Sequence, residues 1–151
     1  MREARTLGSW VLGLFLAIML FWVALETLAP QPPVKNHLFE VFRTTSGIAY
    51  FEPLGRFTVG VLEVIAALLI LLPFTRRLGA ILGFILMLFL GALVVQLVMQ
   101  GITVPVDAIG EGGTVTTTET DPSGLFYLVL GLLAALIAVI VIHPGRAKTG
   151  D

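Results

Sequence analysis

The chain has 151 residues, of which 57% are hydrophobic and 13% are charged, and its formal net charge is −1. A mean hydropathy of +1.00 and a share of charged residues well below the usual value of about 25% indicate a membrane protein rather than a soluble one. The near-neutral charge provides no basic surface for nucleic acid, and the lack of cysteine excludes disulfides and thiolate metal sites.

Four apolar segments are each long enough to cross a hydrocarbon core of about 30 Å, which takes roughly 20 helical residues. Pro73 and a basic turn separate the second segment from the third, Asp121-Pro122 is typical of a helix start, and His143-Pro144 closes the fourth. The sequence therefore predicts an all-α membrane protein, a single domain over residues 1–151, built as an antiparallel bundle of four transmembrane helices. The predicted spans are residues 7–28, 54–74, 78–100 and 123–142.

The first span has an alternative interpretation as a cleaved signal peptide, because it begins with the basic residues of MREAR and is followed by small residues. We favour a retained span, since the apolar run exceeds the roughly 7–15 residues of a signal core. Small residues spaced four apart, such as Gly79 and Gly83, predict close packing of helices within the bundle.

Both long loops show local patterns. In the first loop, Val34, Leu38, Val41 and Phe42 recur at helical intervals, which predicts a short amphipathic helix at the outer interface. In the second loop, ITVPV and TVTTTE flank the glycine-rich stretch GEGG. This pattern is typical of a small β-hairpin, and a solvated loop is the alternative.

The distribution of basic residues predicts the orientation in the membrane. Lys35, Arg43 and Arg56 fall on one side of the bundle, and the other six basic residues fall on the opposite side. By the positive-inside rule, both termini and the turn between the second and third spans face the cytoplasm of a bacterial or archaeal plasma membrane. The six are Arg2, Arg5, Arg76, Arg77, Arg146 and Lys148.

Four polar side chains fall within or at the ends of the spans. Glu26, Arg56 and Gln96 come out near the outer boundary, and Glu63 lies about two turns, roughly 10 Å, deeper. An ionised carboxylate at a membrane centre costs roughly 2.5–3.5 kcal/mol, so we expect Glu63 to face the bundle interior, where it is protonated or paired with Arg56 and Gln96. The pattern predicts an outward-opening polar cleft formed by these four residues. Polar contacts that only hold helices together are the alternative.

No metal site is predicted. His37 and His143 fall on opposite sides of the membrane, and the pair of carboxylates Glu26 and Glu63 has no histidine or third carboxylate to complete a set of metal ligands. No catalytic residues are assigned either.

The run GRFTVGVLEVIAALLILLPFTRRLGAILGFILMLFLGALVVQL, residues 55–97, resembles the DoxX-like superfamily of small four-helix membrane proteins. The second span contains Arg56, Gly60 and Glu63, and its apolar run ends at Pro73. A basic turn and a third span rich in Gly and Ala follow. The resemblance covers roughly residues 35–142, and many members carry a histidine near the position of Gln96. The superfamily includes quinone-linked subunits, factors for enzyme maturation and assembly chaperones.

The resemblance implies an integral membrane accessory or assembly protein that catalyses no reaction alone. We expect it to present the polar cleft to a lipid, a lipophilic small molecule or a partner helix. Membrane lipid, a membrane-protein partner and a second copy of the chain are the expected partners. The alternative is a quinone-interacting subunit of a respiratory oxidoreductase, with a quinone or a bound lipid in the cleft. Fold likeness alone does not choose between them.

Overall fold

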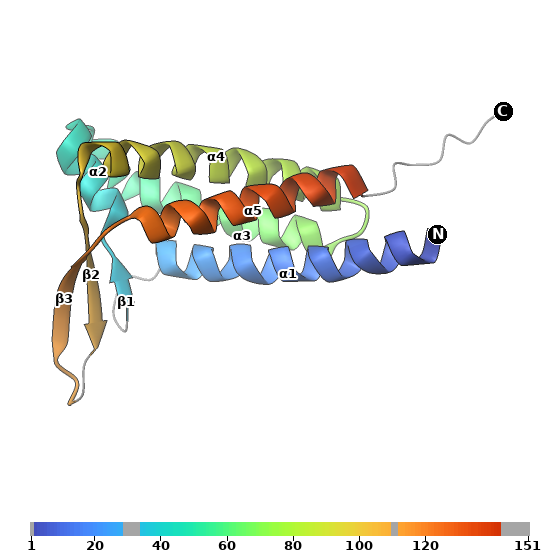
Figure 1. The fold of residues 1–151 in the computed structure, drawn as a ribbon, viewed down its shortest axis with the longest axis horizontal. Helices are drawn as coiled ribbons and strands as arrows, with labels where there is room; N and C mark the ends of the chain where they lie inside the picture. The colour runs from blue at the N-terminus through green and yellow to red at the C-terminus, as the bar shows by residue number, and fades with distance from the viewer. Residues whose placement is uncertain (1, 29–33, 110–111, 143–151) are drawn as a thin grey trace.

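A computed structural model describes residues 2–28, 34–109 and 112–142, and in it four long helices lie side by side (Figure 1). Helix α1 packs on α3, α3 on α4 and α4 on α5, and α5 also contacts α1, which closes a ring of four. All four helices are long and apolar enough to cross a membrane, which confirms the predicted bundle. Their bounds are α1 Arg2–Leu28, α3 Leu54–Leu71, α4 Arg76–Gln100 and α5 Ser123–Ile142.

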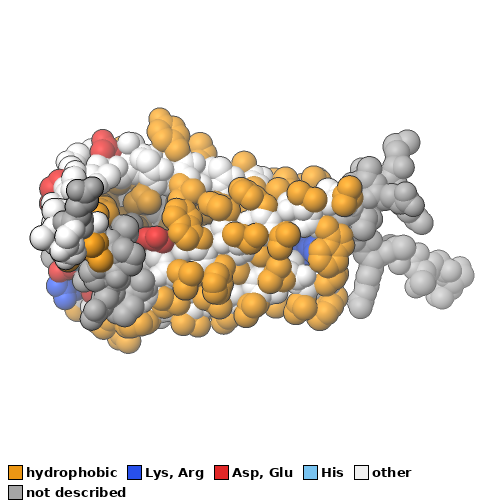
Figure 2. Space-filling model, turned by 90° about the horizontal axis from the view of Figure 1, so that it is seen from below, with side chains coloured by type: hydrophobic (Ala, Val, Ile, Leu, Met, Phe, Trp, Pro, Cys, Tyr) orange, Lys and Arg blue, Asp and Glu red, His pale blue; other side chains and the backbone are white. Residues whose placement is uncertain are grey.

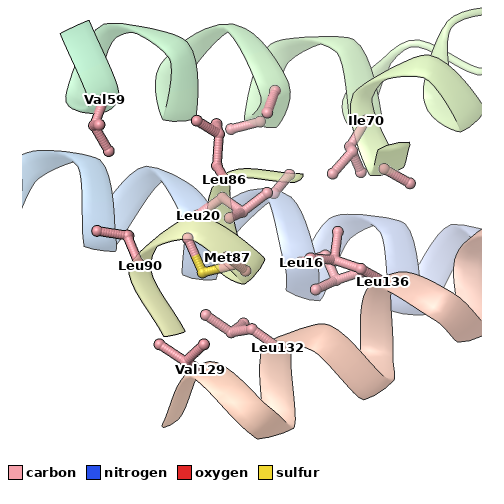
Figure 3. Packing of buried hydrophobic residues seen from close by; sticks show 14 of the residues in the cluster. Leu16, Leu20, Val59, Ile70, Leu86, Met87, Leu90, Val129, Leu132 and Leu136 are labelled. Atoms are coloured by element: carbon pink, nitrogen blue, oxygen red, sulfur yellow. The ribbon is translucent and has the colours of Figure 1, made fainter. Parts of the chain in front are cut away.

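Leucine, isoleucine and methionine side chains from all four helices form the bundle core. Leu16 and Leu20 of α1, Ile70 of α3, Met87 of α4 and Leu136 of α5 are fully buried and converge along the bundle axis (Figure 3). On the face shown in Figure 2, hydrophobic side chains cover the outside of the helices, and most of the charged side chains drawn in colour lie at one end. An apolar coat of this length is what lipid tails require of a spanning bundle.

Glycine allows α3 and α4 to approach closely near their shared turn. A Cβ atom on Gly79 would lie 2.6 Å from Ile70 N and 2.8 Å from Ala66 O, both backbone atoms of α3. Helix α3 ends at Leu71, before Pro73, so the second span is shorter than its predicted end at residue 74. Helix α4 begins at Arg76, slightly before the predicted start at residue 78.

The first outer loop forms strand β1 (Val34–Asn36), helix α2 (Leu38–Ser46) and the short 3₁₀ turn η1 (Ala49–Phe51). The predicted amphipathic helix is confirmed, because Leu38 and Phe42 of α2 are buried against Val94 of α4 and Val104. It begins later than the pattern suggested, since Val34 lies in β1. The backbone of that stretch pairs with another strand, and strand pairing prevails over a helical spacing of only a few residues.

The second outer loop forms the hairpin of β2 (Val104–Ile109) and β3 (Val115–Thr120), so the hairpin prediction is confirmed over the solvated loop. The strands pair antiparallel from Val104 opposite Thr120 to Ile109 opposite Val115, and β1 adds on the other side of β2. Figure 1 shows this sheet across one end of the bundle, opposite the end where α1 begins and α5 ends.

Short polar contacts fix the sheet to the helices. Gly101 ends α4 in the left-handed conformation, at φ 65°, and its N–H donates to Leu97 O and Val98 O. At the start of α5, the Ser123 N–H donates to Asp121 Oδ1 at 2.7 Å, which is the cap that the sequence predicted. The chain therefore leaves α4 and enters α5 at defined points, with the sheet between them.

Candidate functional site

A cavity of about 480 Å³ lies at the end of the bundle that carries the sheet. Its walls come from the last turns of α1, the first turns of α5, α4, and the inner side of α2 and β2. The cavity therefore lies between these ends of α1 and α5, next to α4. The volume falls within the roughly 300–1,000 Å³ of ordinary ligand pockets.

The cavity wall is mostly apolar, with a few polar groups. Glu26 and Thr27 come from α1, Arg56 from α3, Thr120 from the end of β3, and Asp121 from the link between β3 and α5. An apolar pocket with a few polar groups is the usual form of a small-molecule site. The apolar lining consists of Trp22, Val23, Leu38, Phe39, Met87, Leu90, Val94, Val104, Val106, Pro122, Gly124, Leu125, Leu128, Val129 and Leu132.

Arg56 is held by two sets of oxygens. Its Nε donates to Glu52 Oε1 at 2.9 Å and to Glu52 Oε2 at 3.0 Å, and its Nη1 donates to Thr27 O at 3.2 Å and Leu28 O at 3.4 Å. Thr27 and Leu28 are the last residues of α1, whose carbonyls have no partners within the helix. Arg56 thus joins α3 to the negative end of α1, which is favourable for a cation.

Glu63 is fully buried, with 0% of its surface exposed. Among the described residues, neither carboxyl oxygen has a hydrogen-bond partner. The Thr27 hydroxyl is close enough to interact with it, but its hydrogen bond goes to Val23 O at 2.9 Å. Gly60, one turn earlier on α3, lets Thr27 and Leu28 approach, because a Cβ there would lie 2.6 Å from Leu28 Cγ. Glu63 therefore faces the bundle interior, close to Thr27.

Arg56 pairs with Glu52 and not with Glu63, although Arg56 and Glu63 share a face of α3. Side chains on an α-helix point toward its N-terminus. Arg56 therefore reaches back one turn to Glu52, while Glu63 lies two turns in the other direction. The proposed pairing of the two residues is replaced by a local ion pair at the rim of the bundle.

Of the four residues predicted to form the cleft, Glu26 and Arg56 line the cavity, and Glu63 lies outside its lining. Gln96 also lies outside the lining and is exposed. Val94 of the same helix is on the cavity wall, and two residues of α-helix correspond to a rotation of about 200°. Gln96 thus projects from the opposite side of α4.

Several residues were not predicted as part of the site. Trp22 lines the cavity one turn before Glu26. That i, i+4 spacing was the signal available in the sequence. Thr120 and Asp121 reach the cavity only because the hairpin folds over the end of the bundle, and no local pattern contains that information.

Arg76, at the other end of the bundle, was interpreted as a cytoplasmic turn residue, but only 2% of its surface is exposed. Its Nε donates to Ile70 O at 2.9 Å, and its Nη1 donates to Ser9 O at 3.3 Å and Ser9 Oγ at 3.2 Å. The guanidinium also lies 4.3 Å from the ring centre of Trp10. Gly13 leaves space for it, since a Cβ there would be 3.0 Å from Arg76 Nε.

His37 links α2 to the sheet. Its Nδ1 lies 2.9 Å from Glu40 Oε2 and its Nε2 lies 2.8 Å from Asp107 Oδ2. Among residues 2–28, 34–109 and 112–142, no group of three or more His, Cys, Asp or Glu residues is placed to hold a metal ion. His143, Arg146 and Lys148 lie outside the described residues.

Residues 5–144 match a protein family described as methylamine utilisation protein MauE. The match covers nearly the whole chain, including all four helices and the sheet. No curated protein matches the chain, and no solved structure does. The comparisons do not confirm the resemblance to the DoxX-like superfamily.

Proposed function

The chain belongs to the MauE family, and we propose that it is an integral membrane accessory protein that holds a lipid, a lipophilic small molecule or a partner helix in the cavity between α1 and α5. One observation carries the proposal: an apolar space of about 480 Å³ beside Glu26 and Arg56 at one end of a membrane bundle. An association with methylamine utilisation is proposed from the family description alone.

We infer that a guest enters this cavity from the bilayer. The inference is supported by Trp22 of α1, which is half exposed and also lines the cavity. A lipid-soluble guest is therefore favoured over a polar metabolite from water. A quinone would also fit apolar walls, and it is one of the guests that the test below distinguishes.

The proposal is tested by the molecules that remain bound after gentle purification. Native mass spectrometry should detect a retained lipid, quinone or protein, and Leu128→Trp should abolish its retention by filling the cavity from α5. Leu130→Trp is the matched control, because Leu130 is on the same helix but outside the lining. Equal retention by the two variants would rule out the cavity as the binding site.

We further propose that the sheet end faces outward, with both termini in the cytoplasm. The biased distribution of basic residues supports this orientation, and the chain lacks cysteine, so single cysteines can be introduced without background. Cysteine at Thr116 in β3 should react with an impermeant thiol reagent in intact cells. Cysteine at Phe74, in the exposed turn between α3 and α4, should react only after lysis. The reverse pattern would invert the proposed orientation.

A further inference from the structure

The charges around the cavity do not balance. The positive charge of Arg56 is matched by Glu52, which accepts two hydrogen bonds from its Nε. Glu26 forms no ion pair with any residue in the described part of the chain, and Asp121 is exposed at the start of α5. The Ser123 N–H lowers the pKa of Asp121 by donating to its carboxylate. Among the described residues, the cavity therefore carries two carboxylates, Glu26 and Asp121, that form no ion pair.

An aromatic ring accompanies these carboxylates. Trp22 and Glu26 lie one turn apart on the same face of α1, and both line the cavity. Indole is the best of the aromatic side chains for binding a cation over its face, and ammonium groups are the usual ligands of such sites. A carboxylate beside an indole, next to apolar walls, is complementary to a cationic head group attached to an apolar chain.

We propose that the cavity binds an amphiphile with a cationic ammonium head and an apolar tail, the head lying beside Trp22, Glu26 and Asp121. The tail lies against Met87, Leu90 and Leu132, which continue the cavity wall into the bundle core. This inference rests on the proposed function, because it names the class of guest for the same cavity. An anionic amphiphile is disfavoured, since Arg56 is already satisfied by Glu52 and the carbonyl oxygens of α1.

The test measures binding of three probes of equal chain length, namely decyltrimethylammonium, decyl sulfate and decanol, to the protein in a nonionic maltoside detergent. Trp10→Phe leaves Trp22 as the single tryptophan, because the chain has two. The fluorescence of Trp22 then reports occupation of the cavity. Decyltrimethylammonium should bind most tightly of the three, and methylammonium, which has no tail, should not displace it.

Glu26→Gln and Asp121→Asn remove the charges while keeping similar shapes, and asparagine still caps a helix. Together they should weaken decyltrimethylammonium binding by about tenfold or more, with decanol binding unchanged. Glu119→Gln is the matched control, because it removes a carboxylate from β3 outside the cavity lining and should have no effect. Glu26→Gln alone should show part of the loss if the double variant is poorly folded.

The outcomes of these binding experiments distinguish a failure of the cation preference from a failure of the proposed function. Equal binding of all three probes, insensitive to Glu26→Gln and Asp121→Asn but abolished by Leu128→Trp, would overturn the cation preference and leave the proposed function intact. Tighter binding of decyl sulfate would also overturn the preference. No change in Trp22 fluorescence with any probe would overturn both the inference and the proposed use of the cavity.

Discussion

At each end of the bundle, an arginine donates hydrogen bonds to carbonyl oxygens near the C-terminus of a helix. The packing around the two arginines differs. At the end with the α3–α4 turn, Arg76 is buried between Ser9, Trp10 and Ile70, and the helices are in close contact. At the sheet end, Arg56 pairs with Glu52 and borders a cavity.

The difference follows from what packs around each arginine. Gly13 and Gly79 remove side-chain bulk at the closed end, so Arg76 fills the remaining space and the backbones of α3 and α4 approach. At the sheet end, a cavity lies between α1 and α5, and residues of α2 and β2 also line it. The comparison shows that one bundle can combine a closely packed end with an end that contains a cavity.

The largest expected effect is a loss of stability caused by a substitution at the closed end of the bundle. Gly79→Leu should destabilise the protein by about 3 kcal/mol or more, because the new Cβ would overlap backbone atoms of α3 that cannot rotate away. Gly131→Leu is the matched control, since a Cβ there meets nothing within 4 Å. Thermal unfolding in detergent measures both, and equal melting temperatures would refute the close approach of α3 and α4.

A smaller effect is expected when the two arginines are compared directly. Arg76→Ala should cost about 2–3 kcal/mol, because hydrogen bonds from a charged donor to Ile70 O and Ser9 are lost in a buried place. Arg56→Ala should cost less, since Arg56 lies at the rim where water can reach Glu52. Arg76→Lys should restore only part of the loss, as an ammonium cannot reproduce the planar guanidinium contacts. Chemical unfolding that ranks Arg56→Ala as the more damaging change would contradict this account.

The smallest expected effect concerns Glu63 and has the opposite sign. Glu63→Leu should stabilise the isolated protein by about 1–2 kcal/mol, because a fully buried carboxyl group that has no hydrogen-bond partner among the described residues is replaced by an apolar side chain. Glu63→Leu and Arg56→Leu should be additive to within about 0.5 kcal/mol, since the two residues do not interact. A destabilised Glu63→Leu variant would instead reveal a partner for this carboxyl group.

Much of the fold could be predicted because it depends on properties that neighbouring residues share. Apolar runs of membrane length located the four helices, and Pro73 marked the turn between α3 and α4. The glycine-rich stretch between two β-prone segments located the hairpin, and the spacing of Leu38 and Phe42 located α2. These signals are local, so no knowledge of packing was needed.

The candidate site was less predictable, because the direction of each polar side chain depends on its neighbours in space. Glu26 and Arg56 line the cavity, but Gln96 faces away from it, and Arg56 pairs with Glu52. The burial of Arg76 could not be inferred from a sequence in which it resembles an ordinary turn residue of a membrane protein.

The sequence by itself determined that this protein is a four-helix membrane bundle with a short helix and a hairpin in its two long loops, because hydrophobicity, helix breakers and turn residues act over one segment at a time. The tertiary structure alone decided where the free space lies. The cavity lies between the last turns of α1 and the first turns of α5, and its walls combine residues as distant in the chain as Trp22 and Leu132. Relations of that kind are set by how helices pack against one another, and the order of residues along a single helix does not contain them.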